Sequence, residues 1–200
     1  MAMNMDQIPA AKPEMDQEMI EAASEALRDE RLVMGESVFK FEEAFARYVG
    51  VKHAVSLSSG TDALTIALVA MDCVGKDVVT TPFSFIATAN CIVHARGNAV
   101  FSDVSPHDFN LAPDLLRKAV RKGTRAVMPV HLFGHPCDMA PINELAEENG
   151  VLVIEDACQA HGARYKGKRT GALGHVGCFS FYPTKNMTVG GDGGMVTTDD

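Results

Sequence analysis

Short apolar runs alternate along this chain with stretches of helical periodicity, and this alternation restricts the possible folds more than any other feature. The run Val-Leu-Val-Ile at 151–154 has no polar interruption, which is typical of a strand buried on both faces of a sheet. Such strand patterns lie at 53–57, 77–81, 98–102, 125–130 and 151–156. Helical patterns lie at 14–31, 38–49, 61–71, 85–94, 112–122 and 139–149. This order predicts a three-layer α/β/α fold with a mostly parallel central sheet and right-handed crossovers.

The composition argues against several classes of protein. The 200 residues carry a net charge of −8, whereas a nucleic-acid-binding protein needs clustered Lys and Arg. No apolar run approaches the roughly 20 residues of a membrane span, and no secretory signal is recognisable. The five cysteines are widely spread without a CxxC pair, which favours neither a disulfide framework nor a metal site. We therefore expect a cytoplasmic protein in which 13–200 form one domain and 1–12 form an arm outside the core.

Ligands of open α/β sheets bind at the carboxyl ends of the strands, and four polar clusters follow expected strands there. The first, at 58–62, leads into a helix and either offers amides to an anion or simply caps the helix. The second, at 81–85, places Phe83 and Phe85 where a ring-shaped ligand could stack. Packing into the core is the alternative for each ring.

The third cluster, at 155–162, begins with two carboxylates at the end of a buried strand. The strand period of two directs Glu155 and Asp156 to opposite faces, so at most one serves a given site. A buried carboxylate needs a partner, and a ligand cation or a helix cap by Asp156 would satisfy this need. The fourth cluster, at 179–186, places Lys185 between an aromatic-rich strand and a glycine-rich stretch. A desolvated lysine can attack a carbonyl, whereas a lysine on a loop is usually a solvated charge.

Together the four clusters match what pyridoxal 5'-phosphate requires of a protein. The phosphate needs amides and hydroxyls at the start of a helix, and the ring needs a flat contact. The ring nitrogen needs a carboxylate that keeps it protonated, and the aldehyde needs an amine. The clusters thus predict a site for this cofactor.

The same clusters resemble motifs of the DegT/StrS family of pyridoxal-phosphate-dependent nucleotide-sugar aminotransferases. The matching segments are SGTDAL at 59–64, TPFSFIATAN at 81–90, EDACQAHGA at 155–163, SFYPTKN at 180–186 and GDGGMV at 191–196. The similarity extends from about residue 8 to the end of the sequence. It implies the aspartate-aminotransferase type fold, known as fold type I, with this chain forming the large domain.

The resemblance implies a role for each matching residue. Lys185 would attach covalently to the cofactor and later move the substrate proton, and Asp156 would pair with the ring nitrogen. Gln159 would hydrogen-bond the 3-oxygen of the ring. Phe85 would stack on the ring face, with Phe83 as the second choice. The phosphate contacts would come from Gly60, Thr61 and Ser180.

Other polar residues of these motifs receive no catalytic role from the resemblance. His161 could border the sugar site or be a structural histidine. No catalytic role falls to Asp62, Glu155 or Asp192.

The implied reaction moves an amino group from L-glutamate to a keto group of a nucleotide-linked deoxysugar. A sugar dehydratase of the same fold carries His in place of the lysine, so Lys185 argues against that alternative. A non-catalytic sugar-nucleotide sensor would not need Asp156, Gln159, Ser180 and Lys185 together. The run QAHGA at 159–163, together with the stretch at 165–168, slightly favours a 3-keto sugar.

The resemblance also implies that the site needs more than this chain. We expect residues 1–200 to be the N-terminal portion of a longer polypeptide whose small C-terminal domain closes over the sugar. We expect that polypeptide to act as a homodimer with its sites at the subunit interface.

Overall fold

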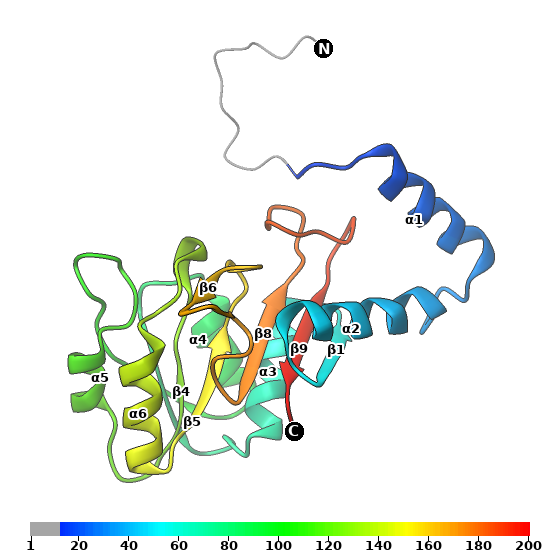
Figure 1. Cartoon of the computed structure of the whole chain (residues 1–200). Helices are drawn as coiled ribbons and strands as arrows, with labels where there is room; N and C mark the ends of the chain where they lie inside the picture. The colour runs from blue at the N-terminus through cyan, green and yellow to red at the C-terminus, as the bar shows by residue number, and fades with distance from the viewer. Residues whose placement is uncertain (1–12) are drawn as a thin grey trace.

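Seven strands form the central sheet of the computed structural model, which describes residues 13–200 (Figure 1). The arm expected at 1–12 lies outside the described residues. In sheet order the strands are β1 (His53–Leu57), β9 (Gly194–Thr198), β8 (Val176–Ser180), β5 (Leu152–Asp156), β4 (Thr124–Met128), β2 (Asp77–Thr80) and β3 (Asn98–Phe101). The helices are α1 (Gln17–Asp29), α2 (Glu36–Val49), α3 (Gly60–Ala70), α4 (Ala87–His94), α5 (Pro113–Ala119) and α6 (Met139–Asn149).

The sheet is mostly parallel, which confirms the predicted fold class. Neighbours pair in parallel from β3 to β8, whereas β9 pairs antiparallel with both β8 and β1. Strand β9 is thus the antiparallel exception in the mostly parallel sheet. The connection from β8 to β9, at 181–193, contains no helix to carry the chain back across the sheet. Without such a crossover the chain returns in the opposite direction.

Helices cover both faces of the sheet and enclose separate apolar clusters. On one face, α3 and α4 pack on the sheet around Leu64, Leu68 and Ile92. On the other face, α6 packs around Ile142 and Leu145, and α2 buries Phe45 against Phe179 and Phe181 in a neighbouring cluster. Successive side chains of β5 therefore pack on opposite faces of the sheet. Val153 belongs to the α6 side and Ile154 to the α3 side.

Two elements lie at the periphery of the fold. The stretch expected to bear on the sugar, 165–168, forms part of a small hairpin of β6 (Arg164–Tyr165) and β7 (Lys168–Arg169). Lys166 and Gly167 at its turn both have positive φ, as in the tight turns of hairpins. Helix α1 buries no side chain and lies away from the sheet (Figure 1). Within 13–200, no helix has both the length and the apolar character that a membrane span requires.

Candidate active site

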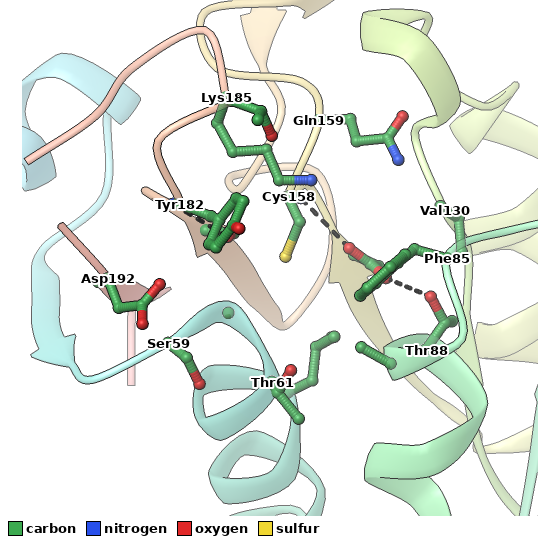
Figure 2. A pocket seen from close by; sticks show the side chains of 17 residues that line it. Ser59, Thr61, Phe85, Thr88, Val130, Cys158, Gln159, Tyr182, Lys185 and Asp192 are labelled. Carbon is green, nitrogen blue, oxygen red and sulfur yellow. Dashed lines mark hydrogen bonds between the residues drawn. The ribbon is translucent and has the colours of Figure 1, made fainter.

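A cavity of about 280 Å³ opens at the carboxyl end of β5 and β8, next to the first turns of α3 and α4 (Figure 2). The connection between β8 and β9 closes one side of it. The structure brings all the predicted site residues together here, because the cavity is lined in part by Gly60, Thr61, Phe85, Asp156, Gln159, Ser180 and Lys185. Their placement agrees with the prediction, and their chemical roles stay predictions.

The start of α3 combines the two alternatives that the sequence left open. Ser59 caps the helix, since its hydroxyl accepts from the N–H of Asp62 at 3.0 Å and donates to the Asp62 carboxylate at 2.8 Å. The hydroxyls of Ser58 and Ser59 lower the pKa of Asp62. The N–H groups of Gly60 and Thr61 have no hydrogen-bond partner within 13–200. These two free amides, at the positive end of the helix dipole, suit an anion.

Close packing at this helix start depends on two glycines. A Cβ on Gly60 would lie 2.6 Å from Cβ of Ser180 and 2.9 Å from Sγ of Cys158. A Cβ on Gly194 would collide with the backbone carbonyl of Ser59. Because neither residue has a side chain, the free amides of α3 lie directly beside the end of β8, which carries the Ser180 hydroxyl.

Asp156 is a buried carboxylate without a cationic partner in the described part of the chain. It is 5% exposed. Its Oδ2 accepts from Oγ1 of Thr88 at 2.8 Å, and its Oδ1 accepts from the N–H of Cys158 at 3.2 Å. No ion pair within residues 13–200 involves Asp156. A buried carboxylate of this kind is suited to a cationic group of a ligand.

The helix-cap alternative for Asp156 is wrong, since a turn and not a helix follows β5. Its bond to the amide two residues ahead is an Asx turn. No local sequence pattern predicts the contact of Thr88 with Asp156, which spans 68 residues. The only sequence signal for Thr88 is its position within the matching segment 81–90.

Lys185 follows β8 on the connection to β9, where its N–H donates to the carbonyl of Tyr182 at 2.8 Å. The side chain is half-buried, and its amine is directed into the cavity (Figure 2). Within 13–200 the amine makes neither a hydrogen bond nor an ion pair. The amine is therefore available to a ligand in the cavity. This favours a binding role for Lys185 over the alternative of a solvated surface charge.

The two phenylalanines of the second cluster have different surroundings. Phe85 lines the cavity and is 66% exposed, so its ring is free to contact a ligand. Phe83 does not line the cavity and packs against Phe109, with 5.6 Å between ring centroids. The first choice for a stacking ring is thus placed at the site, and the second choice is not.

His161 does not line the cavity, which favours the structural alternative for this residue. Its ring lies 5.4 Å from that of Phe179 and 5.5 Å from that of Phe181, between centroids. Burial lowers the pKa of His161 to about 4. Within 13–200, neither ring nitrogen makes a hydrogen bond of normal geometry.

Further residues line the cavity without a predicted role. The thiol of Cys158 is among them, and burial followed by the nearby Asp156 raises its pKa well above the usual value. A thiol held in its neutral form is a poor nucleophile. The remaining polar side chains in this group are Ser59, Thr88, Tyr182, Thr184 and Asp192.

Comparison with known proteins identifies the family of this chain. The sequence model of the DegT/DnrJ/EryC1/StrS aminotransferase family matches residues 13–200. The chain belongs to this family. The resemblance read from the motifs is thereby confirmed.

Three similar proteins illustrate the relationship. The GDP-perosamine synthase of Caulobacter vibrioides is 45% identical over 84% of this chain and 45% of its own length. The dTDP-3-amino-3,4,6-trideoxy-alpha-D-glucose transaminase of Streptomyces venezuelae is 43% identical over 96% of this chain and 51% of its own length. The crystal structure of an aminotransferase from Psychrobacter cryohalolentis matches with a TM-score of 0.90 and 40% identity, over 94% of this chain and 48% of that one. The chain spans about half the length of the curated relatives it matches.

Proposed function

We propose that this chain carries the cofactor site of a pyridoxal-phosphate-dependent aminotransferase. The amino group moves from L-glutamate to a keto group of a nucleotide-linked deoxysugar. The observation that carries the proposal is the meeting of Lys185 and Asp156 in one cavity, each without an ionic partner in the described residues. The family and the names of the similar transaminases support it.

The residues present fit the cofactor in each of its parts. The free amides of Gly60 and Thr61, with the Ser180 hydroxyl beside them, suit a phosphate group. Asp156 suits a protonated ring nitrogen, because a buried carboxylate without a cation is stabilised by one. The exposed ring of Phe85 suits a flat contact with the ligand ring.

The positions of these residues define what each would do in the reaction. Bound pyridoxal phosphate supplies an electron sink for the charge that develops on the substrate carbon. Asp156 would keep the ring nitrogen protonated. The hydroxyl of Thr88 holds the Asp156 carboxylate in place for this role. The amine of Lys185 would hold the cofactor covalently, and as a free base it would accept the proton that leaves the substrate carbon. The ring of Phe85 would contact the cofactor ring and limit the access of water to it.

The nucleotide-linked acceptor is supported by the names of the two similar enzymes, which act on GDP- and dTDP-linked sugars. The preference for a 3-keto sugar was based on 159–163 together with 165–168, and of these residues Gln159 alone lines the cavity. We therefore propose no position for the keto group.

The test is a pair of measurements on the protein reconstituted with pyridoxal phosphate. Borohydride reduction followed by peptide mass spectrometry should place the cofactor on Lys185. Glutamate should convert the visible band of the cofactor and release 2-oxoglutarate, and a panel of 3-keto and 4-keto nucleotide sugars should restore the band. Covalent attachment at another residue, or attachment without any glutamate reaction, would contradict the proposal.

We further propose that residues 13–200 are the large domain of a longer polypeptide that works as a cytoplasmic homodimer. The half-length match to the relatives supports this. So does the exposed apolar surface of the first helical segment, contributed by Met15, Met19, Ile20 and Leu27. Residues 1–200 alone should then aggregate or bind pyridoxal phosphate weakly, as light scattering and cofactor absorbance would show. A fully active monomer of 1–200 would contradict it.

A further inference from the structure

A short turn beside the cavity, Leu132–Gly134, contacts the side chain of Gln159. The backbone N–H of Phe133 donates to Oε1 of Gln159 at 2.9 Å. Because a backbone N–H can only donate, the amide oxygen of Gln159 faces the turn and its amide nitrogen is left for the cavity. Gln159 lines this cavity (Figure 2). Gln159 therefore offers a hydrogen-bond donor to whatever the cavity holds.

Phe133 donates this bond from a backbone conformation that residues with a side chain rarely adopt. Its φ is +53°, and its ring is 78% exposed, so packing of the ring does not hold it there. The buried Asn110 holds the turn on both sides of Phe133. Its Oδ1 accepts from the N–H of Leu132 at 3.2 Å, and its Nδ2 donates to the carbonyl of His135 at 2.9 Å.

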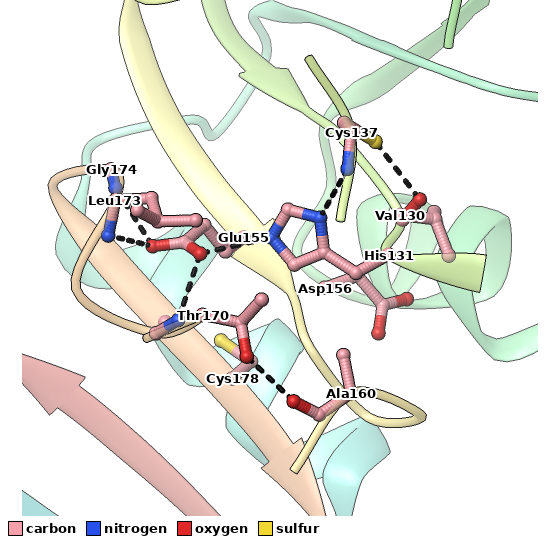
Figure 3. A network of polar contacts seen from close by, with 12 residues as sticks. Val130, His131, Cys137, Glu155, Asp156, Ala160, Thr170, Leu173, Gly174 and Cys178 are labelled. Atoms are coloured by element: carbon pink, nitrogen blue, oxygen red, sulfur yellow. Dashed lines mark hydrogen bonds and ion pairs between the residues drawn. The ribbon is translucent and has the colours of Figure 1, made fainter. Parts of the chain in front are cut away.

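A second anchor precedes the turn, as Figure 3 shows. His131 and Glu155 are both fully buried, with 2.9 Å between Nε2 and Oε2. Nδ1 of His131 accepts from the N–H of Cys137 at 3.1 Å, so the proton lies on Nε2 and is donated to Glu155. The Glu155 carboxylate also accepts from the backbone amides of Gly171, Leu173 and Gly174. A buried network with its donors and acceptors paired is rigid, so the turn is fixed relative to β5.

We propose that the turn Leu132–Gly134 is a positioning device: Asn110 and the His131–Glu155 pair hold its amide in place, and this amide fixes Gln159 as a donor toward the cavity. The inference rests on the proposed function, because the acceptor it implies is the anionic 3-oxygen of the cofactor ring. A donor at this oxygen stabilises negative charge there. Asn110 and His131 are positioning residues, since they act through Gln159.

Hydrogen exchange of the Phe133 amide, measured without cofactor, tests the contact itself. Gln159→Met removes the acceptor and should speed exchange about tenfold, the effect of losing one such hydrogen bond. Gln159→Glu is the matched control, because its carboxylate still accepts from Phe133 and should keep the protection. Equal protection in the parent and in Gln159→Met would overturn the proposal.

The pH titration of the visible cofactor band in the holoenzyme tests the consequence. Gln159→Met should move its midpoint to higher pH by about one unit, because loss of the donor disfavours the form with full charge on the 3-oxygen. His131→Gln and Asn110→Ser should move the midpoint in the same direction by less. Neither should add to the shift of Gln159→Met when combined with it, since all three act through one contact.

The control for a general loss of stability is Thr80→Val. It removes a buried hydrogen bond to the carbonyl of Met128, 2.8 Å long, elsewhere in the sheet, and should leave the midpoint unchanged. A midpoint that responds to Gln159→Met but to neither turn variant would overturn the positioning role and leave the proposed function standing. Absence of any visible band in the full-length parent polypeptide, saturated with pyridoxal phosphate, would instead overturn the proposed function. If His131→Gln does not fold, Asn110→Ser still decides the test. The two side-chain hydrogen bonds of Asn110 go to Leu132 and His135, at the two ends of the turn.

Discussion

Two consecutive carboxylates at the end of β5 lie on opposite sides of the sheet and have different surroundings. Glu155 is fully buried and accepts hydrogen bonds from His131 and from three backbone amides. Asp156 accepts only from Thr88 and Cys158 among the described residues, and it lies against the cavity. A carboxylate whose acceptor positions are filled by the protein stabilises the fold. One with unused acceptor capacity beside a cavity can bind a ligand.

The same difference separates the basic side chains on the two sides. His131 pairs with Glu155 and is fully buried. Lys185 reaches the cavity, and its amine has no partner within 13–200. We infer that changes on the cavity side will reduce turnover with little effect on stability, and that changes on the other side will do the reverse.

The largest expected effect is on turnover in Lys185→Ala. Loss of the amine removes both the covalent attachment and the group that moves the proton, so turnover should fall by about 10⁴-fold or more. The free energy of unfolding should change by less than about 1 kcal/mol, because no ion pair is broken. The glutamate half-reaction and denaturant unfolding measure the two quantities. Lys168→Ala, at an exposed lysine of the hairpin, is the control and should alter neither.

On the opposite side of the sheet, Glu155→Ala should destabilise the protein by about 3–5 kcal/mol, because it leaves the buried His131 and three backbone amides without their acceptor. Denaturant unfolding of the cofactor-free protein measures this. Glu148→Ala, which breaks a surface pair with Arg117, is the control and should cost less than about 1 kcal/mol. A small effect in both variants would mean that burial and pairing do not distinguish these carboxylates.

Much of this arrangement could be predicted from the sequence. The period of two along a strand places Glu155 and Asp156 on opposite faces, and the apolar run before them identifies a strand buried on both sides. Motif matches then point to the cavity residues. The direction of β9 could not be predicted from its own residues, because it depends on whether the connection before it crosses the sheet.

The contacts that fix the site residues were not predictable for a related reason. Thr88 meets Asp156 across 68 residues of sequence, and the amide of Phe133 meets Gln159 across 26. Neither contact has a local pattern, since each arises where separate strands end at the same edge of the sheet. The choice between Phe83 and Phe85 likewise depended on which ring packs against Phe109.

A more conservative change tests the cavity-side carboxylate. Asp156→Asn keeps the shape of the side chain and a bond to Thr88 but removes the charge that holds the ring nitrogen protonated. Turnover should fall by about 10²–10³-fold, while the free energy of unfolding of the cofactor-free protein changes by less than about 1 kcal/mol. Single-turnover rates and thermal melts measure these effects. Normal turnover in a well-folded variant would contradict the role of Asp156.

The smallest expected effect concerns His161, a buried titratable group outside both the cavity and the Glu155 network. Burial lowers its pKa to about 4 in the folded state, against about 6.5 in the unfolded chain. The unfolded state therefore takes up the proton first as the pH falls, and stability declines between about pH 6.5 and pH 4.

His161→Phe preserves the contacts with Phe179 and Phe181 without a titratable nitrogen, so this decline should disappear. The free energy of unfolding of the variant minus that of the parent should therefore be about 2–3 kcal/mol higher at pH 4.5 than at pH 7. Urea unfolding of both proteins at both pH values measures this. His94→Gln, at an exposed histidine, should follow the parent. Parallel loss of stability in the parent and His161→Phe would mean that His161 already carries its proton in the folded protein.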